Sequence, residues 1–166
     1  MHRIGIYSGT FDPVHDGHIA FAREASRICS LDKVIFLPEA VPRNKINVTD
    51  IATRFVQLQE NLSKLPNLEV LDLEQSNFTI KQTLPELQRL FAGAELTLLI
   101  GSDVARSLDR WPDIDRLLET VSLAVGMRGD DAQDELKDMM RKLSFGDVTY
   151  VFTDYPHLSS SQLRVN

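Results

Sequence analysis

The chain is poor in cysteine: Cys29 is the one thiol among 166 residues, so no disulfide can form within it. Chains without disulfides are typical of a reducing compartment. No segment before Arg3 has the character of a signal peptide, and we therefore expect a cytoplasmic protein. Cys29 falls on the apolar side of an expected helix, which predicts a buried thiol.

The chain also lacks long apolar runs and an excess of basic residues. No run approaches the roughly 18–20 apolar residues of a membrane span, so we expect no membrane partner. Lys and Arg number 18 against 24 Asp and Glu, a net charge of −6. Because nucleic-acid surfaces are basic, this balance argues against a nucleic-acid partner. An anionic ligand must then be held by local cations and backbone dipoles.

What the chain does have is an alternation of short apolar segments with segments of helical periodicity. Strands are expected at residues 4–7, 33–37, 68–71, 95–100, 121–127 and 148–152. Helices are expected from residue 16, from Thr49 or Asp50, around 80–91, within 102–118 as two short pieces, at 131–143, and from 157–161. This alternation predicts an α/β fold, a Rossmann-like doubly wound parallel sheet with helices on both faces, in a single domain of residues 1–166. Ligands of such sheets bind at the carboxyl ends of the strands.

The segment RIGIYSGTFDPVHDGH, residues 3–18, carries the strongest chemical signal. A short strand ends near Gly9 and Thr10, and Asp16 is expected to cap the following helix. Backbone N–H groups and the positive end of a helix face the same space at such a crossing, which favours anions. His15 and His18, three positions apart at its mouth, can address one phosphate together.

The pattern G-T-F-D-P-x-H-x-G-H resembles the signature of the H-x-G-H nucleotidyltransferase superfamily. Four further segments are similar to those of bacterial-type nicotinate mononucleotide adenylyltransferases. They are VPRNKINVTDIATRF for the P-x-x-K loop, NFTIKQTLPEL for Y-T-I/D-T-L, GSDVARSLDRWPDIDRLL for I-G-x-D…W, and LSSSQLR for I-S-S-T-x-I-R. These matches follow family order and span nearly the whole chain.

The resemblance implies an adenylyltransferase that joins ATP and nicotinate mononucleotide to give the deamido-NAD dinucleotide and pyrophosphate. His15 and His18 would be catalytic, stabilising charge at the α-phosphate. The ATP-binding residues it implies are Gly9, Thr10, Phe11, Gly17, His18, Gly101, Asp103, Arg128, Ser160, Ser161 and Arg164. The acceptor-binding residues it implies are Lys45, Phe78, Thr79 and Trp111. Mg²⁺ is expected to arrive with ATP, because no carboxylate cluster points to a metal site made by the protein.

The resemblance also assigns roles within these sets. Asp103 would accept hydrogen bonds from ribose hydroxyls, and Trp111 would stack on the pyridine ring. Backbone groups of Phe78 and Thr79 would contact the ring carboxyl group, while Lys45 would reach the phosphates from its loop. Ser160, Ser161 and Arg164 would bind the β- and γ-phosphates at a second helix start.

Three departures from the family pattern bear on these roles. Ser8 stands where the family usually has Gly, and Arg43-Asn44 replaces the common Pro-His. Only two residues follow Arg164, so we expect residues 157–166 to become ordered with ATP.

Two kinds of alternative remain at this stage. One is a related transferase, either a cytidylyltransferase, which lacks the GSD…W segment, or a phosphopantetheine adenylyltransferase, which usually has Thr in place of His15. The other is a nucleotide-binding protein without turnover. The sequence leaves open whether the acceptor is the nicotinate or the nicotinamide form, and whether the chain forms a homo-oligomer.

Overall fold

The computed structural model describes residues 1–41, 47–75, 77–128 and 133–153. Six strands form one sheet in the order β3-β2-β1-β4-β5-β6, and every neighbouring pair is parallel. The strands are β1 Arg3–Gly9, β2 Lys33–Pro38, β3 Leu68–Val70, β4 Glu95–Gly101, β5 Ser122–Met127 and β6 Val148–Phe152. The predicted Rossmann-like sheet is therefore confirmed, and each expected strand is present to within about two residues at either end.

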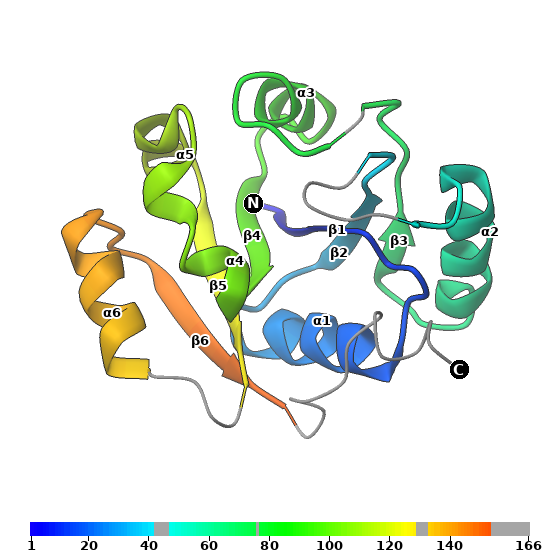
Figure 1. Cartoon of the computed structure of the whole chain (residues 1–166), viewed down its shortest axis with the longest axis horizontal. Helices are drawn as coiled ribbons and strands as arrows, with labels where there is room; N and C mark the ends of the chain where they lie inside the picture. Colours follow the sequence, from blue (N-terminus) through cyan, green and yellow to red (C-terminus); the bar gives the residue numbers. More distant parts are fainter. Residues whose placement is uncertain (42–46, 76, 129–132, 154–166) are drawn as a thin grey trace.

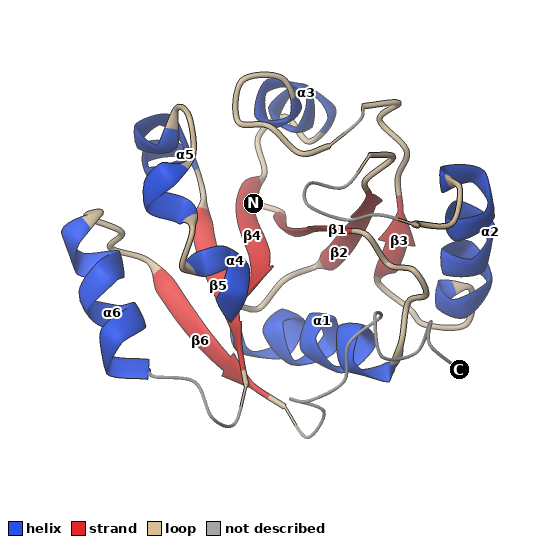
Figure 2. Cartoon of the chain, viewed as in Figure 1, coloured by secondary structure: helices blue, strands red, loops and turns tan. Residues whose placement is uncertain are grey.

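Helices cover both faces of this sheet (Figures 1 and 2). They are α1 Asp16–Ile28, α2 Ile51–Leu62, α3 Thr83–Leu90, α4 Ser102–Ala105, the 3₁₀ helix η1 Leu108–Arg110, α5 Ile114–Thr120 and α6 Gln133–Lys142. Side chains that alternate along each strand feed two separate cores. In β2, Val34 and Phe36 pack in the α1 and α2 core, whereas Ile35 and Leu37 pack in the core of α3, α5 and α6. Within the described residues no helix is long and apolar enough to cross a membrane.

The strand order changes direction between β1 and β4. The chain leaves β1 for α1 on one face, and it leaves β4 for α4 and α5 on the other (Figure 1). Loops that part in opposite directions leave a crevice at the carboxyl edge of the sheet, where ligands of such folds bind. The residues that follow β1 and β4 therefore face this crevice from two sides.

Two local expectations were wrong. The N-cap of α1 is His15 and not Asp16, which lies in the first turn. Cys29 ends α1 and is only partly buried.

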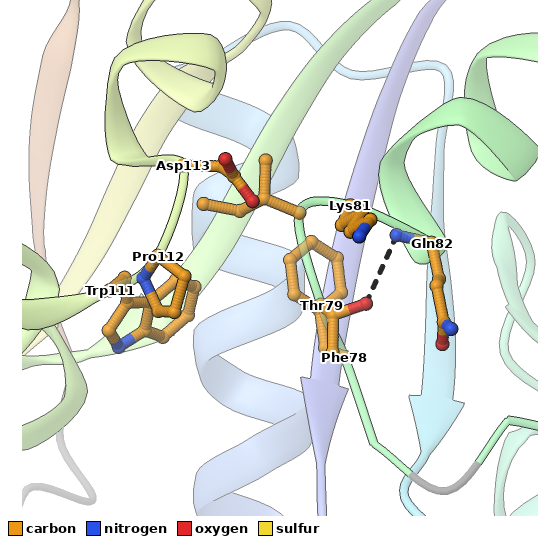
Figure 3. A pocket seen from close by; sticks show the side chains of 8 residues that line it. Phe78, Thr79, Lys81, Gln82, Trp111, Pro112 and Asp113 are labelled. Carbon is orange, nitrogen blue, oxygen red and sulfur yellow. Dashed lines mark hydrogen bonds between the residues drawn. The ribbon is translucent and has the colours of Figure 1, made fainter.

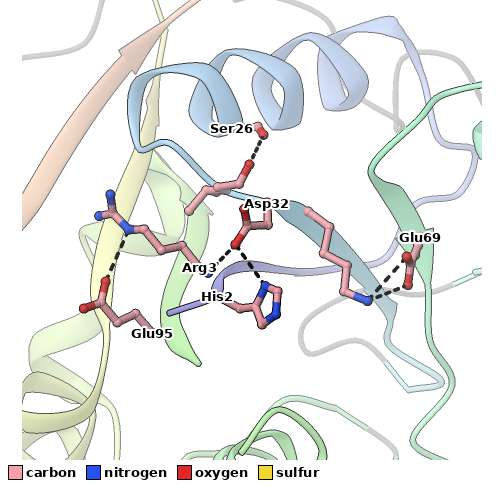
Figure 4. Close-up of polar contacts among 8 residues, drawn as sticks. His2, Arg3, Ser26, Asp32, Glu69 and Glu95 are labelled. Atoms are coloured by element: carbon pink, nitrogen blue, oxygen red, sulfur yellow. Dashed lines mark hydrogen bonds and ion pairs between the residues drawn. The ribbon is translucent and has the colours of Figure 1, made fainter. Parts of the chain in front are cut away.

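The opposite, amino edge of the sheet carries a set of ion pairs (Figure 4). Asp32 accepts the backbone N–H of Arg3 at 2.8 Å and lies 3.4 Å from His2. The Arg3 guanidinium pairs with Glu95 at 3.3 Å, and Lys33 pairs with Glu69 at 3.2 Å. The bond from Arg3 lowers the pKa of the Asp32 carboxyl. This edge satisfies its own charges.

Candidate active site

The start of helix α1 is built from the two histidines of the sequence motif. His15 Nδ1 accepts the backbone N–H of Gly17 at 3.0 Å, and His18 Nδ1 accepts the backbone N–H of His15 at 3.1 Å. The two rings stack with centroids 3.7 Å apart and an angle of 23° between their planes. Because both Nδ1 atoms accept, each neutral ring carries its proton on Nε2. The reciprocal cap thus gives the helix start two Nε2–H donors.

His15 is placed to offer its donor to a ligand. Its Nε2 atom is buried and has no hydrogen-bond partner among the described residues. Burial lowers the pKa of His15, and the nearby Asp16 carboxylate opposes this shift only in part, so the ring is neutral near pH 7. A buried donor at the positive end of a helix calls for an anionic partner. The hydroxyls of Ser8 and Ser102, at the carboxyl ends of β1 and β4, are likewise buried without partners in this part of the chain.

Arg54 holds the loops around the histidines in place. Its side chain is 1% exposed, and its Nη1 donates to the carbonyl oxygens of Thr10 at 2.7 Å and Glu39 at 2.8 Å. Its Nε donates to the Thr49 carbonyl at 2.6 Å, and Nη2 reaches Ala40. One guanidinium therefore joins the loop after β1 to the loop after β2.

The supporting role of Arg54 was missed in the sequence. The available signal was its spacing, because Arg54, Leu58 and Leu62 follow one another by four positions and form the buried stripe of α2. From the sequence alone, an arginine in such a stripe is expected to reach solvent, because the carbonyl groups that accept its hydrogen bonds come from other segments.

Gly9, Thr10 and Phe11 shape the loop before the histidines. The Phe11 ring is 2% exposed and packs edge-on against Tyr7 and His18, with both ring centroids 5.1 Å away. A Cβ on Gly9 would lie 3.1 Å from the Phe11 ring, so the position favours glycine. Thr10 is buried, and its carbonyl oxygen accepts a hydrogen bond from Arg54. Contact of these three residues with ATP stays a prediction.

The ends of β4 and β5 bring two predicted ATP-binding residues together. Asp103 pairs with Arg128 at 3.3 Å and with Arg106 at 3.4 Å. A Cβ on Gly101 would meet no atom within 4 Å, so space lies open at the end of β4. The structure thus places Asp103 and Arg128 as a pair beside that space, while their contacts with ribose and phosphate stay predictions.

Phe78, Thr79 and Trp111, predicted to bind the acceptor, line one pocket of about 300 Å³ (Figure 3). The remaining lining residues are Ile80, Lys81, Gln82, Pro112 and Asp113. The Phe78 and Trp111 ring centroids are 6.2 Å apart, and Trp111 Nε1 donates to Ser107 Oγ at 3.2 Å. Trp111 therefore packs partly on the core and also presents an aromatic wall to the pocket.

The backbone N–H groups expected to meet a ring carboxyl group are already used within the protein. Phe78 donates to Glu39 Oε2 at 3.2 Å, and Thr79 donates to Thr83 Oγ1 at 2.9 Å. Trp111 donates to the Leu108 carbonyl at 3.1 Å. A carboxylate would have to displace one of these bonds to be bound by these donors.

Four predicted site residues, Lys45, Ser160, Ser161 and Arg164, lie outside the described residues. So do Arg43-Asn44 and the expected helix near residue 157. Within the described part of the chain, no group of three or more His, Cys, Asp or Glu side chains is placed to hold a metal ion.

A doubly wound sheet with a histidine-capped helix at its switch point is typical of the class of α/β proteins that bind phosphate-bearing ligands. The family model described as cytidylyltransferase-like matches residues 6–166. A "probable nicotinate-nucleotide adenylyltransferase" of Dictyoglomus turgidum is 35% identical over 98% of this chain and 82% of its own length. One of Clostridium novyi is 32% identical over 99% of this chain and 86% of its own length. The chain belongs to the nicotinate-nucleotide adenylyltransferases of the cytidylyltransferase-like family, as the motifs predicted.

A solved structure supports the fold independently. The nicotinic acid mononucleotide adenylyltransferase of Plasmodium falciparum, complexed with NaAD, superposes with a TM-score of 0.82 at 16% identity. The match covers 99% of this chain and 83% of that one. At this identity the likeness concerns the arrangement of strands and helices.

Proposed function

We propose that the chain transfers the adenylyl group of ATP to nicotinate mononucleotide, forming deamido-NAD and pyrophosphate. The observation that carries this proposal is the stacked histidine pair at the carboxyl end of β1, with the buried, unpartnered Nε2 of His15. The names of the curated relatives support this reaction over cytidylyl or phosphopantetheine chemistry.

In the proposed reaction, a 5′-phosphate oxygen of the mononucleotide attacks the α-phosphorus of ATP in line. A new P–O bond forms as the bond to the α,β-bridging oxygen breaks, and pyrophosphate leaves with that oxygen. No covalent enzyme intermediate forms, so the protein contributes positioning and charge stabilisation.

His15 and His18 donate from Nε2 to the non-bridging α-phosphate oxygens as negative charge builds there. Their Nδ1 atoms stay bonded to backbone N–H groups, which holds the rings in one tautomer and one orientation. The dipole of α1 adds to the same stabilisation. Arg54 positions the loop that leads into this cap.

The remaining residues bind the two substrates. Gly101 and Asp103 face the ATP ribose, with Arg128 close to the phosphates. Ser160, Ser161 and Arg164 hold the β- and γ-phosphates, and Lys45 the acceptor phosphate. ATP enters with Mg²⁺ already on its triphosphate, since the described residues offer no carboxylate cluster. We further propose that residues 1–166 form one domain, that the protein is cytoplasmic, and that it has no nucleic-acid partner.

The direct test measures pyrophosphate release with ATP, Mg²⁺ and one acceptor at a time. The acceptors are nicotinate mononucleotide, nicotinamide mononucleotide and phosphopantetheine, with CTP replacing ATP in a further arm. We expect turnover with ATP and the nicotinate form, and a lower kcat/KM with the nicotinamide form. Turnover only with CTP or with phosphopantetheine would assign the alternative transferase, and binding of ATP without turnover of any acceptor would assign the nucleotide-binding protein.

A further inference from the structure

Two unpaired charges of opposite sign line the aromatic pocket. Lys81 lies beside Gln82 on the segment that leads into α3, and Asp113 comes from the far side of the pocket, next to Pro112 (Figure 3). Both residues are exposed at its mouth. Neither side chain forms an ion pair or hydrogen bond with any residue that the structure describes, whereas the charges of the amino edge are paired.

Such a pair matches a zwitterionic ring better than a neutral or singly charged one. The ring of nicotinate mononucleotide is a pyridinium cation that bears a carboxylate, and the nicotinamide form has the same cation with a neutral amide. In both nucleotides the pyridinium cation can stack on the faces of Phe78 and Trp111, and the Asp113 carboxylate attracts it. Only the carboxylate distinguishes the two forms.

Backbone N–H groups discriminate weakly between these substituents. An amide oxygen accepts from an N–H group as a carboxylate does, although the charged bond is stronger. The N–H groups of Phe78, Thr79 and Trp111 are moreover committed to Glu39, Thr83 and Leu108. A cation at the pocket, by contrast, attracts the carboxylate form and repels the bare pyridinium of the amide form.

We infer that Lys81 is a specificity-determining residue, whose ammonium group pairs with the ring carboxylate and selects the nicotinate form of the acceptor. The inference rests on the proposed function and adds a charge contact to the backbone contacts that the family resemblance implies. Lys81 does not touch the reacting atoms, so it acts on acceptor binding and leaves the chemical step alone.

The test compares kcat/KM for the two mononucleotides in wild type and in Lys81→Met. We expect the ratio of nicotinate to nicotinamide activity to fall about tenfold, through a higher KM for the nicotinate form at unchanged kcat. This is the size expected for one charge-assisted hydrogen bond at a partly open site. Turnover of the nicotinamide form should be retained, with an equal or lower KM because the repulsion of its pyridinium is removed, and this would also show that the variant is folded. Lys81→Arg should recover most of the ratio.

Two matched variants separate the charge of Lys81 from other effects. Lys64→Met removes an exposed lysine beyond the end of α2 and should leave the ratio unchanged. Asp113→Asn removes the opposite charge from the same pocket, and the ratio should rise because the carboxylate loses a repulsion.

Each contrary outcome has a distinct meaning. An unchanged ratio in Lys81→Met, with wild type active on the nicotinate form, overturns the inference and leaves the proposed function standing. If the ratio of nicotinate to nicotinamide activity also falls in Asp113→Asn, the inference is overturned as well. Any change in the pocket would then lower the ratio, whatever the sign of the charge removed. Absence of turnover in wild type with both nucleotides overturns the proposed function itself.

Discussion

The two edges of the sheet differ in whether their polar groups have partners within the protein. At the amino edge, His2, Asp32 and Glu95 pair with near neighbours on the surface. At the carboxyl edge, His15 Nε2 and the hydroxyls of Ser8 and Ser102 are buried without partners among the described residues. The fourth buried atom without a hydrogen bond, Arg3 Nε, belongs to the amino edge and has an ion pair with Glu95.

This difference separates stability from function within one sheet. A buried polar group without a partner costs free energy, so a protein keeps it where a ligand supplies the missing bond. At the amino edge, the charged side chains that the structure describes pair with one another, and the Arg3 guanidinium is compensated by Glu95. The carboxyl edge stays incomplete until a substrate binds, and the following experiments test that contrast.

The largest effect is expected from the histidine pair. His18→Ala and His15→Ala should each lower turnover on the order of 10²–10³-fold, the size associated with one charge-stabilising donor, while ATP still binds. Steady-state pyrophosphate release and ATP titration measure the two quantities. Asp32→Asn, at the amino edge, is the control and should keep turnover within twofold. Turnover near the wild-type level in both histidine variants would contradict the phosphate-stabilising role.

Arg54→Leu tests the frame that supports the carboxyl edge. It leaves the carbonyl oxygens of Thr10, Glu39 and Thr49 without their donor, so the free energy of unfolding should fall by roughly 2–3 kcal/mol. Urea denaturation followed by circular dichroism measures this change. Arg89→Leu removes an exposed arginine that pairs with Glu86 and with no other residue that the structure describes, and it should cost less than about 1 kcal/mol. Equal losses in the two variants would argue against the supporting role of Arg54.

Trp111→Leu tests the pocket apart from the histidines. Loss of the aromatic wall should raise the KM for nicotinate mononucleotide by roughly three- to tenfold, because aromatic contacts contribute about 0.5–1.5 kcal/mol beyond their buried area. The KM for ATP should not change. If the KM for ATP rises and the KM for nicotinate mononucleotide does not, Trp111 does not belong to the acceptor pocket.

The smallest effect is a difference in pH dependence between the two edges. The pKa of His15 is lowered by burial, so its contribution to stability is complete above pH 6.5 and is lost as the pH falls through the lower folded pKa. The pKa of Asp32 is lowered from 3.8, so its contribution is complete above pH 3.8 and is lost below it.

Two variants separate these pH windows. Asparagine caps helices well and does not titrate, so His15→Asn should flatten the loss of stability just below pH 6.5. Asp32→Asn should change only the acid range. Urea midpoints measured from pH 7.5 to pH 3 test both, and a pH profile of His15→Asn identical to wild type would show that His15 does not titrate with unfolding.

Local patterns in the sequence were enough for the strands, the alternation with helices, and the position of both histidines at one strand-to-helix crossing. These features depend on residues within a few positions of one another, where periodicity and turn chemistry act. The motifs also identified Phe78, Thr79 and Trp111 as one group, because family resemblance carries long-range information that periodicity lacks.

The tertiary structure alone decided how these pieces meet. Strand order and register put Asp103 beside Arg128 and bury Arg54 among carbonyl groups of two loops. They also commit the backbone N–H of Phe78 to Glu39, 39 positions away in the chain, and place Lys81 and Asp113 in the lining of one pocket. Whether a polar group is satisfied depends on every acceptor within about 3 Å of it, and those acceptors come from segments far apart in the chain.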